Sequence, residues 1–242
     1  MKKIILFLIV LFSFAGCDVG QEPSIEQPIS TTLSTILDVS DPRAYWPDAD
    51  HLLQMYHCKE TPNGECWFRL KTITDKRLTP IITYHLADAG SMEKENREDD
   101  PQFRNRNINA FYSTIHKALS DFYTHTDTTQ SLSNSECFRS VVDELRFLAD
   151  NKSDRRILIV ASDLMEKSDI LSSYLADLTN PKQLAEKLNN AYPAPQNLKG
   201  VTVIFLFDPR NRMEDQTFSL MVDVYKALLQ PTGAEIKVQA NL

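Results

Sequence analysis

The chain has 242 residues, with 33 acidic residues against 26 lysines and arginines and a formal charge of −7. Its 42% hydrophobic and 24% charged residues, with 6 Gly and 12 Pro, are ordinary for a globular protein and exclude collagen-like, low-complexity and disordered classes. A chain this acidic, with no run of Lys or Arg beyond its first residues, is not suited to bind nucleic acid through phosphates. Only the extreme N-terminus carries a long apolar stretch, which excludes a membrane protein with several spans.

The N-terminus has the pattern of an export signal. Two lysines precede an apolar run over residues 4–15, which is too short to cross about 30 Å of hydrocarbon but suits a signal-peptide core. The run ends in Phe-Ala-Gly followed by Cys17, which resembles the bacterial lipobox, where the cysteine is lipidated and becomes the new N-terminus. The alternative is an ordinary secretory signal in which Cys17 has no role.

This pattern divides the chain into three parts. Residues 1–16 are predicted to be a lipoprotein signal peptide, 17–30 the lipidated cysteine with a flexible tether, and 31–242 a single domain. Acyl chains on Cys17 would attach the protein to a membrane of the bacterial cell envelope, as a periplasm-facing or outer-membrane lipoprotein. The choice between the inner and the outer membrane is left open.

The body of the chain alternates apolar strands with amphipathic helices. Strands are predicted over residues 33–39, 66–74, 78–86, 155–161, 201–207 and 234–238, and helices over 108–122, 136–149, 181–190 and 214–229. The charged stretch 88–106 is predicted to be an exposed loop, and Pro80 marks its strand as an edge strand. Near-continuous apolar strands separated by helices indicate a parallel sheet covered on both faces. We therefore predict an α/β domain with a three-layer, doubly wound, Rossmann-like, mostly parallel sheet and one antiparallel edge hairpin.

Three cysteines lie in the domain. Cys58 and Cys66 flank a segment with a Pro-Asn-Gly turn signal, so a disulfide between them is predicted for an oxidising compartment. Three independent thiols are the alternative. Cys137 is predicted to be a core thiol, and metal binding by the cysteines is not favoured because no paired cysteine spacing is present.

Acidic residues follow three of the predicted buried strands. Asp38, Asp163 and Asp208 lie at or just beyond the carboxyl ends of strands 33–39, 155–161 and 201–207. In doubly wound sheets, ligands bind at this edge. Each of the three can also be a turn or cap residue, and this is the favoured interpretation of Asp208.

The first strand ending in Asp38-Val-Ser40, the hairpin, the helices and the strand ending in Ser-Asp163 resemble the von Willebrand factor A (vWA) domain over about residues 31–242. The resemblance implies a metal-ion-dependent adhesion site for Mg²⁺ or Mn²⁺, built from Asp-x-Ser-x-Ser, a Thr from a later loop and an Asp after the fourth strand. The matching residues are Asp38, Ser40, Ser135 and Asp163. The site is degenerate, because Pro42 replaces the third motif position and Ser135 replaces the Thr.

These features predict a non-catalytic, lipid-anchored interaction module that binds an envelope protein at the carboxyl edge of the sheet. Binding through a divalent cation and metal-free binding both remain open. The alternatives are an envelope hydrolase using Asp38 or Ser40, and a purely structural lipoprotein subunit of an envelope complex. No catalytic residue is assigned, since the chain has no Gly-x-Ser-x-Gly, Ser-x-x-Lys or Gly-rich phosphate loop.

Overall fold

The structure is a computed structural model that describes most of the predicted domain. The described residues are 29–40, 46–56, 58–59, 63–74, 80–89, 101–126 and 134–240. The predicted signal peptide, the predicted lipidation site at Cys17 and the motif position at Pro42 lie outside the described residues. Within them, no helix is long and apolar enough to cross a bilayer.

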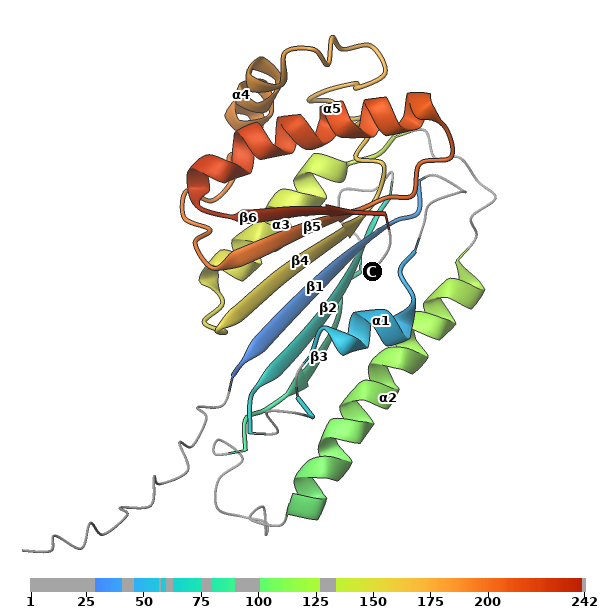
Figure 1. Ribbon diagram of the computed structural model, residues 1–242, viewed down its shortest axis with the longest axis vertical. Coiled ribbons are helices and arrows are strands. Elements are labelled where there is room, and N and C mark those ends of the chain that lie inside the picture. The colour runs from blue at the N-terminus through green and yellow to red at the C-terminus, as the bar shows by residue number, and fades with distance from the viewer. Residues whose placement is uncertain are drawn as a thin grey trace, which may run out of the picture.

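A six-stranded sheet forms the centre of the domain (Figure 1). Its strands are β1 (Thr31–Asp38), β2 (Cys66–Ile73), β3 (Ile82–Leu86), β4 (Arg155–Ala161), β5 (Val201–Leu206) and β6 (Glu235–Gln239). Their order is β3-β2-β1-β4-β5-β6, and only the β2–β3 pair is antiparallel. This arrangement confirms the predicted doubly wound α/β fold with an antiparallel strand at one edge.

The burial of each strand follows its place in the sheet. All eight residues of β1 are buried, because β1 is paired on both sides and covered on both faces. The edge strand β3 instead alternates in exposure. The predicted strand 78–86 contained Pro80, but β3 begins only at Ile82, so the proline precedes the strand. A proline has no N–H to donate to the hydrogen bonds between strands.

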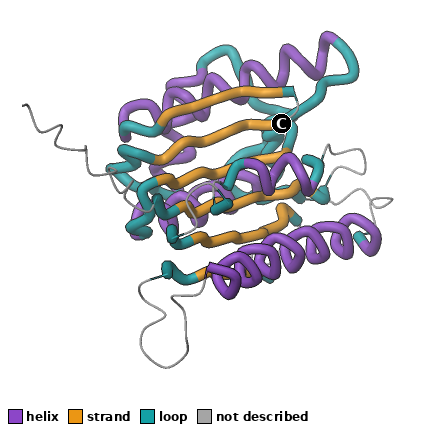
Figure 2. The backbone as a smooth tube through the Cα atoms, turned by 60° about the horizontal axis from the view of Figure 1, so that its bottom comes forward, coloured by secondary structure: helices purple, strands orange, loops and turns teal. Residues whose placement is uncertain are grey.

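Helices cover both faces of the sheet and complete the three layers (Figures 1 and 2). On one face lie α1 (Ala49–Gln54) and α2 (Pro101–His125), and on the other α3 (Cys137–Asp150), α4 (Pro181–Ala191) and α5 (Arg212–Leu229), which is followed by the 3₁₀ turn η1 (Gln230–Thr232). Two buried apolar clusters match these faces, one centred on Leu33 and Phe68 and the other on Ile36 and Phe205.

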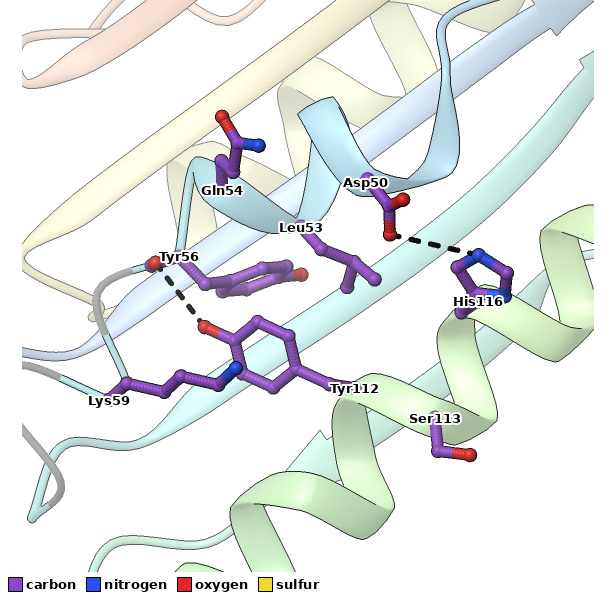
Figure 3. Close-up of a pocket in the computed structure, with 8 residues that line it drawn as sticks. All are labelled: Asp50, Leu53, Gln54, Tyr56, Lys59, Tyr112, Ser113 and His116. Atoms are coloured by element: carbon purple, nitrogen blue, oxygen red, sulfur yellow. Dashed lines mark hydrogen bonds and ion pairs between the residues drawn. The ribbon is translucent and has the colours of Figure 1, made fainter.

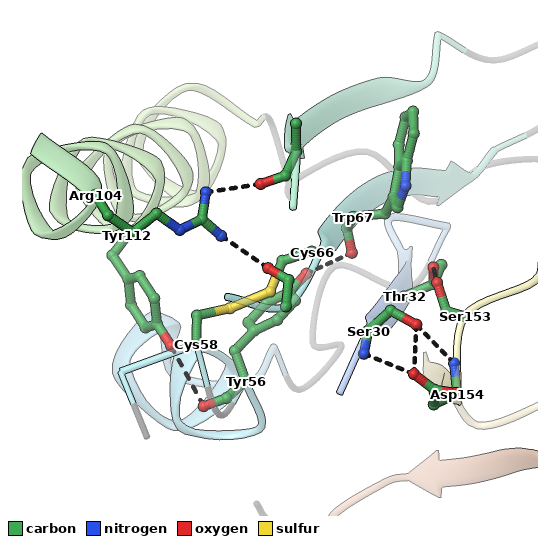
Figure 4. Close-up of a disulfide and its surroundings, with 12 residues drawn as sticks. Ser30, Thr32, Tyr56, Cys58, Cys66, Trp67, Arg104, Tyr112, Ser153 and Asp154 are labelled. Carbon is green, nitrogen blue, oxygen red and sulfur yellow. Dashed lines mark hydrogen bonds between the residues drawn. A yellow bond between two sulfur atoms is a disulfide. The ribbon is translucent and has the colours of Figure 1, made fainter. Parts of the chain in front are cut away.

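The start of α2 corrects the prediction of an exposed loop over 88–106. The helix begins at Pro101, in a stretch whose charged residues hid its helical pattern. Arg104 is 6% exposed, and its guanidinium donates to the carbonyl oxygens of Ala87 at 2.7 Å and Gly64 at 2.8 Å (Figure 4). A buried arginine is stable here because the carbonyls accept its hydrogen bonds.

Two features fasten the amino edge of the sheet (Figure 4). The predicted disulfide is confirmed, since Cys58 and Cys66 are bonded, whereas Cys137 is a buried free thiol as predicted. Just before β1, Ser30 donates from its main-chain N and its hydroxyl to Asp154 Oδ2, at 2.8 Å each, and Asp154 N donates back to Ser30 Oγ at 2.9 Å. This reciprocal clamp fixes where the chain enters the domain.

Candidate functional site

The centre of the candidate site is the carboxylate of Asp38, the last residue of β1. Asp38 is only 1% exposed. Oδ1 accepts from the Ser40 main-chain N at 2.8 Å and from Ser40 Oγ at 2.6 Å, and Oδ2 accepts from Ser162 Oγ at 2.6 Å. Trp46 Nε1 donates to the Asp38 carbonyl at 3.1 Å, so a side chain also holds the main chain at the carboxyl end of β1.

Ser135 comes to this carboxylate from the segment before α3. Its Oγ lies 3.3 Å from Ser40 Oγ, and the residue is 7% exposed. An isolated backbone bridge holds the segment in place, since Ser135 and Lys167 each donate their N–H to the other's carbonyl at 3.0 and 3.1 Å. The structure therefore brings together three of the predicted site residues: Asp38, Ser40 and Ser135.

Asp163 lies in a tight turn directly after β4. Its Oδ1 accepts from Met165 N at 2.9 Å, while Ser162 Oγ accepts from Leu164 N at 2.9 Å. Leu164 is fully buried and has φ of 62°, a left-handed backbone conformation that branched and bulky residues rarely adopt. The Asp163 carboxylate thus caps its own turn, and the third predicted acid, Asp208, is exposed in the turn after Phe207.

The donor set at this edge fits a divalent cation only in part. Hydroxyl and carboxylate oxygens are the ligands that Mg²⁺ prefers. Among the residues that the structure describes, however, no three His, Cys, Asp or Glu side chains gather where they could hold a metal. Asp38 and Ser40 would be the main ligands, with Ser135 beside them and Asp163 engaged in its turn.

A layer of buried polar groups lies beneath the edge, and the sequence did not reveal it. Cys137 Sγ lies 3.5 Å from Tyr225 Oη and 3.9 Å from Ser162 Oγ. Burial, together with the negative charges of Glu166 and Asp38, raises the pKa of the Cys137 thiol well above its usual value, so the group is a neutral thiol and not a reactive thiolate.

Glu166 is the other hidden member of this layer. The residue is 1% exposed, and its Oε2 accepts from Phe138 N at 2.7 Å, at the start of α3. Burial raises the pKa of this carboxyl to about 7. No sequence signal marks Glu166. Charged residues are expected on the surface, and the main-chain N from which Glu166 accepts belongs to a helix residue 28 positions earlier.

Large apolar side chains are exposed around the same edge. Tyr174 is 64% and Leu175 89% exposed in the connection after β4, and Met213 is 76% exposed at the start of α5, just after β5. Because β4 and β5 are adjacent and parallel, both connections leave the same edge of the sheet (Figure 1). In the described part of the chain no other large hydrophobic residue exceeds 46% exposure.

A separate groove of about 770 Å³ lies between α1 and α2, on one face of the sheet (Figure 3). Leu53 and Tyr56 form its apolar floor, and His116 Nε2 lies 3.7 Å from Asp50 Oδ1 on its rim. Ser113 and His116, both on α2, also line the groove (Figure 3).

Comparison with known proteins gives a likeness in structure but none in sequence. No family model matches the chain, and no curated protein matches it significantly. A solved structure, the crystal structure of the SpRpn10 VWA domain, is similar over 87% of this chain and 88% of its own, with 13% sequence identity and a TM-score of 0.37. The class of the fold, a doubly wound α/β domain with one antiparallel edge strand, is defined here by the strand order and pairing themselves.

Proposed function

We propose that the protein is a lipid-anchored, non-catalytic interaction module of the bacterial cell envelope that binds a partner protein at the carboxyl edge of its sheet. The observation that carries this proposal is the exposure of Tyr174, Leu175 and Met213, in the connections that leave the carboxyl edge after β4 and β5. Exposed apolar side chains gathered in one region mark interaction surfaces, and Tyr and Met are enriched where proteins meet.

The path of the chain supports an anchor at the opposite end of the domain. The clamp between Ser30 and Asp154 lies where the chain enters β1, and the Asp38 network lies where β1 ends. Eight residues of strand at about 3.3 Å each separate the two by about 26 Å. Lipid on Cys17 would thus reach the domain at its amino edge and leave the binding edge facing away from the bilayer.

Labelling with a palmitate analogue tests the anchor. We expect label on the wild-type protein and none on Cys17→Ala, with the unlabelled variant released from membranes. Label that persists in Cys17→Ala, or a wild-type protein that takes none, would contradict the lipid anchor and leave the binding edge to be tested on its own.

A divalent cation at Asp38, Ser40 and Ser135 is a refinement of this proposal. When bound, it would supply a positive charge that a partner's carboxylate can ligate. A cation present at about 100 times its Kd adds about 2.7 kcal/mol to the free energy of unfolding. We expect Mg²⁺ or Mn²⁺ to raise Tm against EDTA in the wild type and in Asp208→Ala, but not in Asp38→Ala. Equal Tm values in EDTA and in either cation would make the binding metal-free.

A hydrolytic role for Ser40 has less support. Its hydroxyl donates to Asp38, and no described histidine accepts a hydrogen bond from it. Histidine is the general base that most often activates a serine nucleophile.

A further inference from the structure

Glu166 occupies an unusual position for a carboxylate. It is almost completely buried, and among the described residues its Oε1 has no hydrogen-bond partner, while Oε2 accepts from Phe138 N at the start of α3. A buried carboxylate oxygen without a donor costs free energy when the group is ionised, and the cost disappears when it is protonated.

The backbone on both sides of Glu166 holds the two parts of the binding edge. Ser173 N donates to the Glu166 carbonyl at 2.8 Å, and Ser173 Oγ accepts from Glu166 N at 3.1 Å, directly before the exposed Tyr174 and Leu175. On its other side, Lys167 makes the two backbone hydrogen bonds to Ser135. The exposed apolar turn and the Ser135 segment are therefore both fastened next to one buried acid.

The charged and titratable groups around Glu166 come from three elements. From the start of α3, Glu136 raises and Arg139 lowers the pKa of Glu166, and Arg139 is itself paired with Glu136 at 3.1 Å and with Asp169 at 3.0 Å. Cys137 and, from α5, Tyr225 are neutral neighbours whose own pKa values Glu166 raises. The Ser168 hydroxyl lowers the pKa of Glu166, yet burial outweighs all of these effects.

We propose that Glu166 is a positioning residue that couples proton concentration to the shape of the binding edge. When neutral, it keeps the backbone bridge to Ser135 and the turn at Tyr174–Leu175 closed. When it ionises, the buried charge favours opening of the segment from Glu166 to Ser173. This inference rests on the proposed use of the carboxyl edge for binding, and it makes that binding weaker as pH rises through neutrality.

Hydrogen exchange at the amides of Ser135, Lys167 and Ser173 tests the coupling on the free protein. With a pKa of about 7 closed and the ordinary 4.5 open, the opening equilibrium rises about tenfold between pH 6 and pH 8, after correction for intrinsic exchange rates. We expect this rise in the wild type and its loss in Glu166→Gln, which keeps an acceptor for Phe138 N but cannot ionise.

Two comparisons distinguish a positioning role of Glu166 from a general effect on the stability of the fold. Glu186→Gln, at an exposed carboxylate on α4, should keep the full tenfold rise. A Glu166→Gln variant that is less stable overall but pH-independent at these amides supports the inference, because only the pH dependence is diagnostic. A wild type without the rise, or a rise retained in Glu166→Gln, overturns it. No partner is needed, so failure here leaves the proposed binding function intact.

Discussion

The amino and carboxyl edges of the sheet differ in how firmly their connections are fastened and in how much apolar side chain they expose. At the amino edge, the disulfide at Cys58, the buried Arg104 and the clamp between Ser30 and Asp154 fasten the connections to the domain. At the carboxyl edge, Leu175 is 89% exposed and Glu166 is buried with an oxygen that no described group pairs. Exposed apolar side chains mark interaction surfaces, so this difference supports the proposal that the amino edge stabilises the domain and the carboxyl edge binds the partner.

The largest expected effect concerns Glu166 and pH. Its folded pKa of about 7 lies above the ordinary 4.5, so the folded state binds more protons between these values. The free energy of unfolding should therefore fall as pH rises from 4.5 to 7, by about 3 kcal/mol, and change little above that. Denaturant unfolding of wild type and Glu166→Gln across this range measures the difference. If the free energy of unfolding had the same pH dependence in both proteins, Glu166 would not be the buried acid that distinguishes the carboxyl edge.

Removing the disulfide tests the amino edge. The bond joins residues eight positions apart, so replacing both Cys58 and Cys66 by serine should lower the free energy of unfolding by about 2.5 kcal/mol through loop entropy. Thermal melting under oxidising conditions measures this, with reduced wild type as the matched control. Partner binding at the far edge should be unchanged; a loss of binding at temperatures where the variant is folded would show that the two edges are not separable.

The clamp should have a smaller effect. Asp154→Asn weakens the hydrogen bonds from Ser30 and should cost about 1 kcal/mol, because the site is exposed. The same hydrogen bonds lower the pKa of Asp154, so its contribution is present above the ordinary value of 3.8 and is lost as pH falls below it. Melts at pH 7 and pH 3 should show a smaller difference between the two proteins at the lower pH. An equal difference at both pH values would assign the effect to something other than the carboxylate.

The smallest effect on stability should come from the proposed surface itself. Leu175→Ser removes an exposed side chain and should change the free energy of unfolding by less than about 0.5 kcal/mol. Denaturant unfolding checks this, with Val238→Ser on β6 as the comparison at 46% exposure. A loss of several kcal/mol in Leu175→Ser would mean that the side chain is buried in the folded protein and is not a binding surface.

Local patterns were enough to predict most of the fold. The predicted strand at 155–161 is β4 itself, because a strand paired on both sides buries its central side chains and leaves an unbroken apolar run, here residues 157–161. The beginning of α2 was missed because the buried Arg104 is satisfied by carbonyls distant in sequence, which no helical pattern can show.

The site was predictable where topology or the vWA resemblance places a residue. Asp38 was predicted at this edge because the carboxyl ends of parallel strands share it, and the resemblance implied that Ser40 and Ser135 lie beside it; the structure brings the three together. Glu166 and Leu175 could not be found in this way. The burial of one and the exposure of the other depend on the packing of the connection between β4 and α4, which neither composition nor periodicity encodes.

Photo-crosslinking in cells tests the binding edge most directly. A photoreactive amino acid replaces Leu175 or Met213 at the carboxyl edge and, in a control protein, Ile29, which lies just before β1 at the amino edge and is 40% exposed. We expect one discrete protein adduct from both carboxyl-edge positions and none from Ile29. An adduct from Ile29 with none from Leu175 and Met213, or the same adduct from all three positions, would contradict the proposed binding edge.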